Sequence, residues 1–270
     1  METLTSSHNP KIKQLLRLRE RRERDRLHYF LIEGYRELLR AVDGDIDIDQ
    51  LFISPEHFLG SNEKTLIEKL VSRGTELFSV SPSLFSKISY RDRPDGLIGV
   101  AKQQKRSLKD ITLSSQPFLM IAEAIEKPGN LGTILRSSDA VGVDAFIVCD
   151  RCTDVYNPNV VRSSVGTLFT VPVVEAESEE TIHWLKEKKI QIVATTPHAS
   201  QEYTDVDLTG PVAIVVGTEQ LGLSEKWLKT SDISLRIPMK GKADSLNVAT
   251  ASTLLLYEVL RQRSHQNSLL

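Results

Sequence analysis

The chain has 270 residues, of which 40% are hydrophobic and 26% charged. This length suits two domains, and this composition excludes a collagen-like, low-complexity or wholly disordered protein. The net charge of −2 would by itself argue against a strongly basic nucleic-acid binder. However, residues 1–112 carry 20 basic and 17 acidic groups, whereas residues 113–270 carry 14 and 19. The positive pole therefore lies at the N-terminus, where residues 11–26 alone have a charge of +5.

The first hundred residues alternate short helix and strand patterns. Asn9 followed by Pro10 predicts a helix start, and the apolar residues that follow recur at helical spacing. Strands are then expected at residues 30–32, 50–53, 76–80 and 97–101, and helices at residues 35–42, 64–73 and 83–88. This pattern predicts a small α/β unit with its own core.

A second stripe of the N-terminal helix is basic. A charge run on a helix can be a solvated face or a set of phosphate contacts, and the sequence pattern alone leaves both interpretations open. The residues of this stripe are Lys13, Arg17, Arg21 and Arg24.

The second half repeats the alternation on a larger scale, after a polar and basic stretch at residues 102–116 that indicates a linker. β-Branched runs at residues 118–122, 145–149, 171–174, 191–194, 212–216 and 233–237 predict strands. Helical patterns lie between most of them, which favours a mostly parallel sheet covered on both faces. A long helix is expected at residues 245–263, starting with Ser245 as a plain N-cap or as a site residue.

Two further features bear on the compartment and on metals. The chain has no apolar run long enough for a membrane span and no secretory signal pattern at its start, so a cytoplasmic location is expected. Cys149 and Cys152 stand at C-x-x-C spacing, but zinc would need four ligands and a redox pair usually opens a helix. Because Cys149 ends an apolar strand pattern, an inert buried cysteine is favoured, and no metal site is expected.

Three segments differ from ordinary connections. The first, residues 126–136, follows a predicted strand with a glycine turn and a helix, the geometry that presents backbone N–H groups to a ligand. It contains Asn130, Gly132 and Arg136 but not the G-x-G-x-x-G dinucleotide fingerprint. Arg136 is either a ligand-binding residue or a surface arginine.

The second and third segments also follow predicted strands. Residues 216–223 place Glu219 between Gly217 and Gly222, which fits either a pocket rim or a turn with a solvated glutamate. Residues 237–249 carry a flexible loop and then Ser245 and Asn247 at the start of a helix. Helix propensity does not favour a short amide side chain such as that of Asn247 in a first turn, so this residue is a candidate for another role.

Taken together, the three segments resemble the motifs of the SpoU class, the TrmH-type RNA ribose 2′-O-methyltransferases of the SPOUT superfamily. The matching patterns are N-x-G-x-x-x-R, G-x-E-x-x-G-L and I-P-M followed by S-L-N-V-A, in order and similarly spaced. The resemblance covers about residues 117–263. Residues 1–105 resemble the L30e-like substrate-binding domain that many members carry.

The resemblance implies a fold, an assembly and a domain division. The expected fold class is α/β, with a trefoil-knotted parallel-sheet methyltransferase domain at residues 117–263 after the L30e-like α/β domain. Residues 106–116 would then be the linker and residues 264–270 a tail. Family members work as homodimers with active sites at the subunit interface, so a homodimer is expected.

The resemblance further implies methyl transfer from S-adenosylmethionine to a ribose 2′-hydroxyl, with Arg136 beside the hydroxyl. A guanidinium is a poor general base, so we expect Arg136 to stabilise charge and position phosphate. Asn130 and Glu219 would orient it, and Ser245 and Asn247 would shape the ribose site. The implied cofactor-binding residues are Thr195, Thr196, Val216, Gly217, Glu219, Gly222, Ile237, Met239, Leu246 and Ala249.

The implied partner is RNA, with ribosomal RNA favoured over transfer RNA by analogy. In this context the basic stripe is interpreted as a phosphate contact. The predicted RNA-binding residues are Arg162, Arg17, Arg21 and Arg24. Two alternatives differ in class: a nicotinamide-dependent reductase, which lacks its fingerprint here, and a non-catalytic RNA-binding module, which does not account for the three motifs.

Overall fold

The computed structural model describes residues 3–267, and the chain divides into two compact units. Unit 1 contains the chain up to Gln104 together with Asp154–Thr170, and unit 2 contains the rest. Residues 154–170 lie within the range expected for the second domain, yet they pack within unit 1. The predicted domain ranges stay a prediction.

Unit 1 is built on a mixed five-stranded sheet of order β1-β4-β3-β5-β2. Strands β3 and β4 are parallel, and β5 runs antiparallel to β2 and β3. The strands are β1 Thr3–Leu4, β2 Tyr29–Glu33, β3 Ile48–Ile53, β4 Glu76–Val80 and β5 Leu97–Lys102. The helices are α1 Pro10–Arg17, α2 Arg21–Leu27, α3 Tyr35–Asp43, α4 Glu63–Ser72, α5 Pro82–Ile88 and α7 Pro158–Ser163.

The expected elements of unit 1 are confirmed with small shifts at their ends. Helix α1 begins as predicted, because the Asn9 side chain accepts a hydrogen bond from the Lys11 N–H and Pro10 occupies the first helical position. One core cluster joins the apolar faces of α1 and α5 to one face of the sheet. The basic run, however, is two helices and not one, since the chain turns between Arg17 and Arg21.

Unit 2 is built on a seven-stranded, all-parallel sheet of order β10-β12-β9-β11-β6-β7-β8. The strands are β6 Phe118–Glu123, β7 Ala145–Cys149, β8 Val173–Ala176, β9 Gln191–Thr195, β10 Gln201–Glu202, β11 Val212–Val216 and β12 Ile233–Arg236. The helices are α6 Pro128–Val141, α8 Ser178–Glu187, α9 Glu225–Thr230 and α10 Val248–Asn267. The expected parallel α/β sheet is thereby confirmed.

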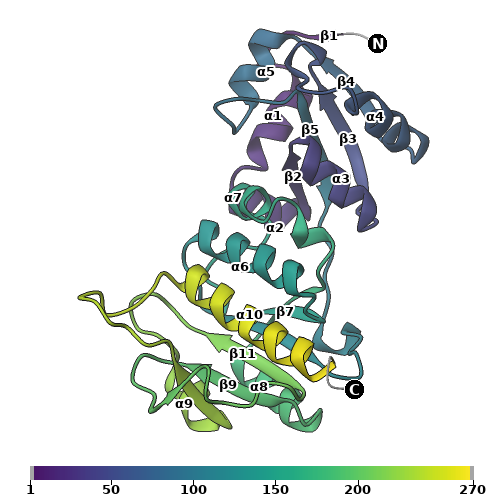
Figure 1. The fold of residues 1–270 in the computed structure, drawn as a ribbon. Coiled ribbons are helices and arrows are strands. Elements are labelled where there is room, and N and C mark those ends of the chain that lie inside the picture. The colour runs from purple at the N-terminus through teal and green to yellow at the C-terminus, as the bar shows by residue number, and fades with distance from the viewer. Residues whose placement is uncertain (1–2, 268–270) are drawn as a thin grey trace. The chain divides into compact units, whose positions relative to one another are not determined.

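Helices cover both faces of this sheet. Trp184 of α8 and Trp227 of α9 pack on one face, with alternate residues of β6, β7, β9 and β11. On the other face α10 packs beside α6 and next to β11 (Figure 1). The buried central strands explain why β6, β7 and β11 are continuous apolar runs in the sequence.

The range predicted as the linker holds a 3-10 turn at Leu108–Asp110 with a capping box and a buried Leu108. Two expectations for the second half need correction. The last helix begins at Val248 and not at Ser245, because the Asn247 side chain accepts from the Ala249 N–H and takes the capping place. Helix α10 also runs through residues 264–267 of the expected tail, and residues 268–270 lie outside the described part.

Among residues 3–267, no helix combines the length and the apolar character that a membrane crossing requires.

Candidate active site

The register of the parallel sheet of unit 2 brings the motif segments to one edge. Strands β6 and β11 are neighbours, with Ala122 opposite Val216, and β9 lies on the other side of β11. The segments that leave the carboxyl ends of these strands therefore start side by side. In open α/β sheets this edge is where ligands bind.

The loop after β11 is a tight turn closed by two backbone hydrogen bonds between Thr218 and Gly222, both of 3.0 Å. Glycine is required at Gly217, because a Cβ there would lie 2.2 Å from the Gly222 carbonyl oxygen. Gly222 itself has a φ of +70°, in the left-handed region. This closed turn fixes where Glu219 points.

Glu219 is the centre of a polar cluster that joins all three motifs. Asn130, in the first turn of α6, and Lys127, just before that helix, both donate to the Glu219 carboxylate. Asn247 donates from Nδ2 to Asn130 Oδ1 at 3.2 Å and to Glu219 Oε1 at 3.4 Å. Asn130 and Asn247 lie 117 positions apart in the sequence, so the fold alone brings them together.

The cluster borders a cavity of about 660 Å³ at the same edge of the sheet. Nine of the ten residues predicted to bind cofactor line this cavity, and Ala249 is not among the lining residues. Ser245 also lines it. The lining positions predicted from the sequence are Thr195, Thr196, Val216, Gly217, Glu219, Gly222, Ile237, Met239 and Leu246.

The cavity suits a nucleoside carrying a short polar chain. Its volume is within the range of small-molecule sites, about 300–1,000 Å³. Apolar side chains such as Leu235 and Met239 share its lining with the hydroxyl-bearing Thr195 and Thr196. The Thr195 hydroxyl donates to the Val215 carbonyl at 2.9 Å, which fixes the end of β9 against β11.

The predicted catalytic residues Arg136 and Ser245 and the predicted RNA-binding arginines lie outside the Glu219 cluster. Arg136 is an exposed residue of α6, and within residues 3–267 no hydrogen bond joins it or Ser245 to the Glu219 cluster. Arg17, Arg21 and Arg162 are exposed in unit 1, with Arg21 3.6 Å from Asp25.

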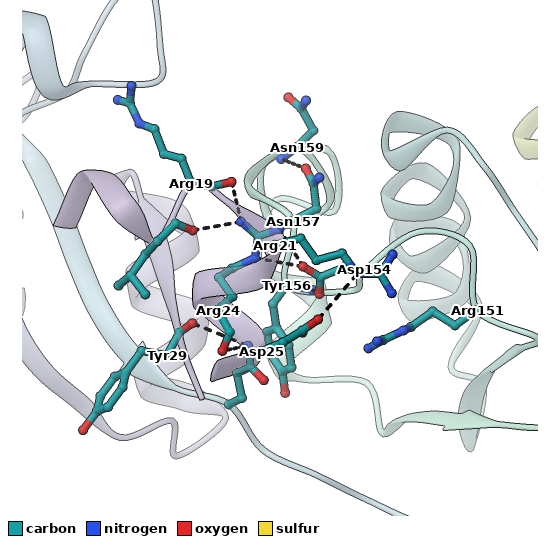
Figure 2. Close-up of polar contacts among 12 residues, drawn as sticks. Arg19, Arg21, Arg24, Asp25, Tyr29, Arg151, Asp154, Tyr156, Asn157 and Asn159 are labelled. Carbon is teal, nitrogen blue, oxygen red and sulfur yellow. Dashed lines mark hydrogen bonds and ion pairs between the residues drawn. The ribbon is translucent and has the colours of Figure 1, made fainter. Parts of the chain in front are cut away.

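Arg24 does not fit the RNA-binding role expected for it. It is 1% exposed, and its Nε and Nη2 donate to Asp154 Oδ2 at 2.8 and 2.6 Å (Figure 2). Its Nη1 donates to the carbonyls of Leu18 and Arg19, at the end of α1. These contacts occupy the guanidinium inside the protein, so it is not presented to a phosphate.

Sequence reasoning gave no role to two residues of this region. Lys127 donates to Glu219, and its place in the first motif, three residues before Asn130, was the available signal. Glu123, at the buried end of β6, accepts from the Ser224 N–H at 2.8 Å and so ties that strand to the start of α9. Nothing in the local pattern distinguished Glu123 from a solvated strand-end residue.

The cysteine interpretation fits the structure. Cys149 ends the buried strand β7, where its thiol donates to Thr181 Oγ1 at 3.4 Å, and Cys152 is exposed. Burial raises the pKa of the Cys149 thiol to about 12. A thiol with so high a pKa is not a redox nucleophile near neutral pH.

A parallel α/β sheet with a cavity and a polar cluster at its carboxyl edge defines a cofactor-binding α/β protein. Two family models match the chain: the SpoU rRNA Methylase family over residues 117–257 and the MRM3-like substrate binding domain over residues 9–99. The chain belongs to the SpoU rRNA methylase family.

Relatives along nearly the whole chain agree with this membership. A 23S rRNA (uridine(2479)-2′-O)-methyltransferase of Streptomyces viridochromogenes is 32% identical, over 91% of this chain and 87% of its own. A crystal structure described as an RNA 2′-O ribose methyltransferase is 42% identical with a TM-score of 0.86, over 97% of this chain and 100% of that one. A crystal structure of an AdoMet-bound rRNA methyltransferase from Sinorhizobium meliloti is 31% identical with a TM-score of 0.88, over 96% of this chain and 97% of that one.

Proposed function

We propose that this chain transfers the methyl group of S-adenosylmethionine to a ribose 2′-hydroxyl of ribosomal RNA. The observation that carries the proposal is the convergence of Asn130 and Asn247, each from another motif, on Glu219, which lines the cavity. Family membership and the named rRNA enzymes among the relatives support the reaction class and the substrate class.

The residues of the cavity would hold the cofactor. Bound S-adenosylmethionine supplies an electrophilic methyl group. The segments after β9, β11 and β12 would hold the cofactor through their backbone without a dinucleotide fingerprint, since glycine turns expose N–H and C=O groups directly. Gly217 and Gly222 allow this close approach.

Arg136 is proposed to act on the RNA side of the reaction. A guanidinium stays protonated, so its contribution is to stabilise negative charge at the attacked hydroxyl and to hold a neighbouring phosphate. Asn130 and Glu219 orient the first turn of the helix that carries Arg136. Ser245, exposed at the cavity, would contact the target ribose together with Asn247.

Unit 1 is proposed to position the RNA through exposed basic residues. Arg17, Arg21 and Arg162 are all exposed there, and phosphate contacts fix a register without reading sequence. Replacing Arg17 and Arg21 by Gln should reduce RNA affinity and lower the slope of affinity against salt concentration. Unchanged affinity at low salt would remove these two residues from the interface. Ribosomal RNA as substrate also favours a cytoplasmic location.

A homodimer is proposed on the exposed side of α10. One side of α10, which carries Ser252, Leu255 and Val259, is buried in the core of unit 2. Leu254 and Tyr257 instead remain 39% and 49% exposed, one turn apart on the same helix. Light scattering should show a dimer that Tyr257→Glu weakens and that Leu59→Glu, an exposed control in unit 1, does not.

The substrate class is tested by offering the purified chain three RNAs with labelled S-adenosylmethionine. These are large-subunit rRNA, small-subunit rRNA and total tRNA, each transcribed without modifications. We expect label in ribosomal RNA. Label in tRNA alone would favour a tRNA 2′-O-methyltransferase, and cofactor binding with no transfer to any RNA would favour a non-catalytic module.

A further inference from the structure

Tyr90 is the exposed aromatic residue of unit 1. Its side chain, in the loop between α5 and β5, is 41% exposed, whereas the other large exposed hydrophobic residues described in this unit, Leu39, Leu59 and Val71, are aliphatic. An exposed aromatic ring needs an explanation when the protein holds it in one place. Three segments hold this one.

The contacts of Tyr90 come from β2, from α7 and from the turn after α1. Its N–H donates to Glu33 Oε2 at 2.8 Å, and its hydroxyl accepts from Asn159 Nδ2 at 2.9 Å. The Arg19 guanidinium lies over the ring, 5.8 Å from its centre. Arg19 is itself fixed, because its Nη2 donates to the Ile88 carbonyl at 2.6 Å.

The loop that carries Tyr90 is organised around two carboxylates. Glu33 accepts from the Ser89 hydroxyl and from the Arg91 N–H, and Arg91 donates back to the Glu33 carbonyl at 2.7 Å. Arg91 also forms an ion pair of 2.7 Å with the buried Glu37. A ring on such a loop loses little conformational freedom when a ligand stacks on it.

Exposed arginines lie on the segments around the ring, alongside the Glu33 carboxylate and the exposed Asp92. Arg162 is exposed on α7 three residues after Asn159, so the two share a helix face one turn apart. Arg93, also exposed, belongs to the same loop as Tyr90. Figure 2 shows that the Arg19 and Asn159 side chains extend away from the buried Arg24–Asp154 pair.

An exposed aromatic ring among arginines is the combination that binds single-stranded RNA, where unpaired bases stack on rings and phosphates meet cations. We propose that Tyr90 is a stacking platform for an unpaired nucleobase of the RNA substrate, with Arg19 behind the ring and Arg162 on an adjacent phosphate. The proposal rests on the proposed function in taking RNA as the ligand. It adds that the substrate is read at a single-stranded nucleotide by unit 1.

The test uses the full chain and two RNA probes, a single-stranded 12-nucleotide oligoadenylate with one 2-aminopurine and a 12-base-pair duplex. The wild-type chain should quench the 2-aminopurine fluorescence, because stacking on an aromatic ring quenches this base. Tyr90→Leu should lower the affinity for the single strand roughly five- to 150-fold, the range of one lost base–aromatic stack. Tyr90→Phe and Tyr90→Trp keep a ring and should stay within about threefold of wild type.

Three controls make the outcome decisive. Duplex affinity, S-adenosylmethionine affinity and melting temperature should be the same in Tyr90→Leu and wild type. Single-strand affinity that Tyr90→Leu leaves unchanged, or a loss of equal size for the duplex, would overturn the platform. If Tyr90→Leu does not fold, the absence of quenching by wild type overturns it instead.

The platform and the proposed function fail in distinguishable ways. Absence of methyl transfer by the wild-type chain would contradict the function and leave the binding comparison intact. Loss of the Tyr90 effect alone would contradict the platform and leave methyl transfer intact.

Discussion

Arg24 and Asp154 form a buried ion pair across 130 residues of sequence, with an Nη2–Oδ2 distance of 2.6 Å and exposed fractions of 1% and 3%. The pair joins the first helices of unit 1 to a segment that follows β7 of unit 2 in the chain. Asp154 also accepts from the Tyr156 N–H, and the Tyr156 ring lies 4.5 Å from that of Phe30. Unit 1 is therefore completed by residues that lie within the range matched by the SpoU rRNA methylase model, residues 117–257.

Arg24→Met should destabilise unit 1 strongly. The substitution leaves the Asp154 carboxylate buried without its partner and removes the donor to the carbonyls of Leu18 and Arg19, just after α1. Breaking a buried pair on one side costs about 3–5 kcal/mol. Arg26→Gln, which removes an exposed pair with Glu23 on the same helix, is the matched control and should change little. Urea unfolding curves measure both, and equal midpoints for the two variants would contradict the structural role of Arg24.

A fragment ending at residue 112 should not fold cooperatively by itself. It keeps Arg24 and Phe30 but loses Asp154, Tyr156 and Phe169, which cover them. A synthetic peptide of residues 153–171 should restore a cooperative thermal transition, and the same peptide with Asp154→Asn should restore less. A fragment that melts at one temperature with or without the peptide would show that the segment is dispensable.

Glu219→Gln should lower kcat/KM for methyl transfer about 10- to 100-fold, as expected when one hydrogen-bonded charge is neutralised. The amide keeps the shape of the side chain, but its NH₂ group replaces one of the two oxygens and so faces either the Lys127 donor or the donors of Asn130 and Asn247. Glu187→Gln, an exposed change at the end of α8, serves as the control. Wild-type rates with Glu219→Gln would mean that the cluster only closes the turn.

Cys149 should resist thiol reagents in the folded protein. Its pKa of about 12 lies above the ordinary value, so the neutral thiol persists through pH 9 and little thiolate forms. At pH 8 a disulfide reagent should label one thiol in the native wild-type chain and two after unfolding. Native Cys152→Ser should then give almost no label. Rapid labelling of two native thiols would reopen the C-x-x-C pair as a redox site.

Much of the fold could be predicted from periodicity. The strand over residues 145–149 coincides with β7, because a strand buried on both faces is one continuous apolar run. The break between α1 and α2 could not be predicted from the sequence, since no glycine or proline marks it. Arg24 donates to the carbonyls of Leu18 and Arg19 in this break, and its own partner Asp154 lies 130 residues further along the chain, beyond any local pattern.

The candidate site was predictable as three separate segments but not as one cluster. Asn130, Glu219 and Asn247 each had an ordinary local explanation, and only the resemblance to a known family connected them. The sheet order supplies the physical reason, since β6 and β11 are neighbours although about 90 residues apart. Asn247 keeps its local role as well, because it caps α10 while it donates into the cluster.

The measurement that tests the central claim most directly is mapping of methylated riboses in ribosomal RNA treated with wild type and with Arg136→Ala. A 2′-O-methyl group protects its 3′ linkage from alkaline cleavage, so each modified site appears as one missing band in the hydrolysis ladder. We predict a protected linkage with the wild type and a loss of about 100- to 1,000-fold in the rate for Arg136→Ala, with S-adenosylmethionine binding retained. Methylation on a base, or near wild-type protection by a folded, RNA-binding Arg136→Ala, would contradict the account.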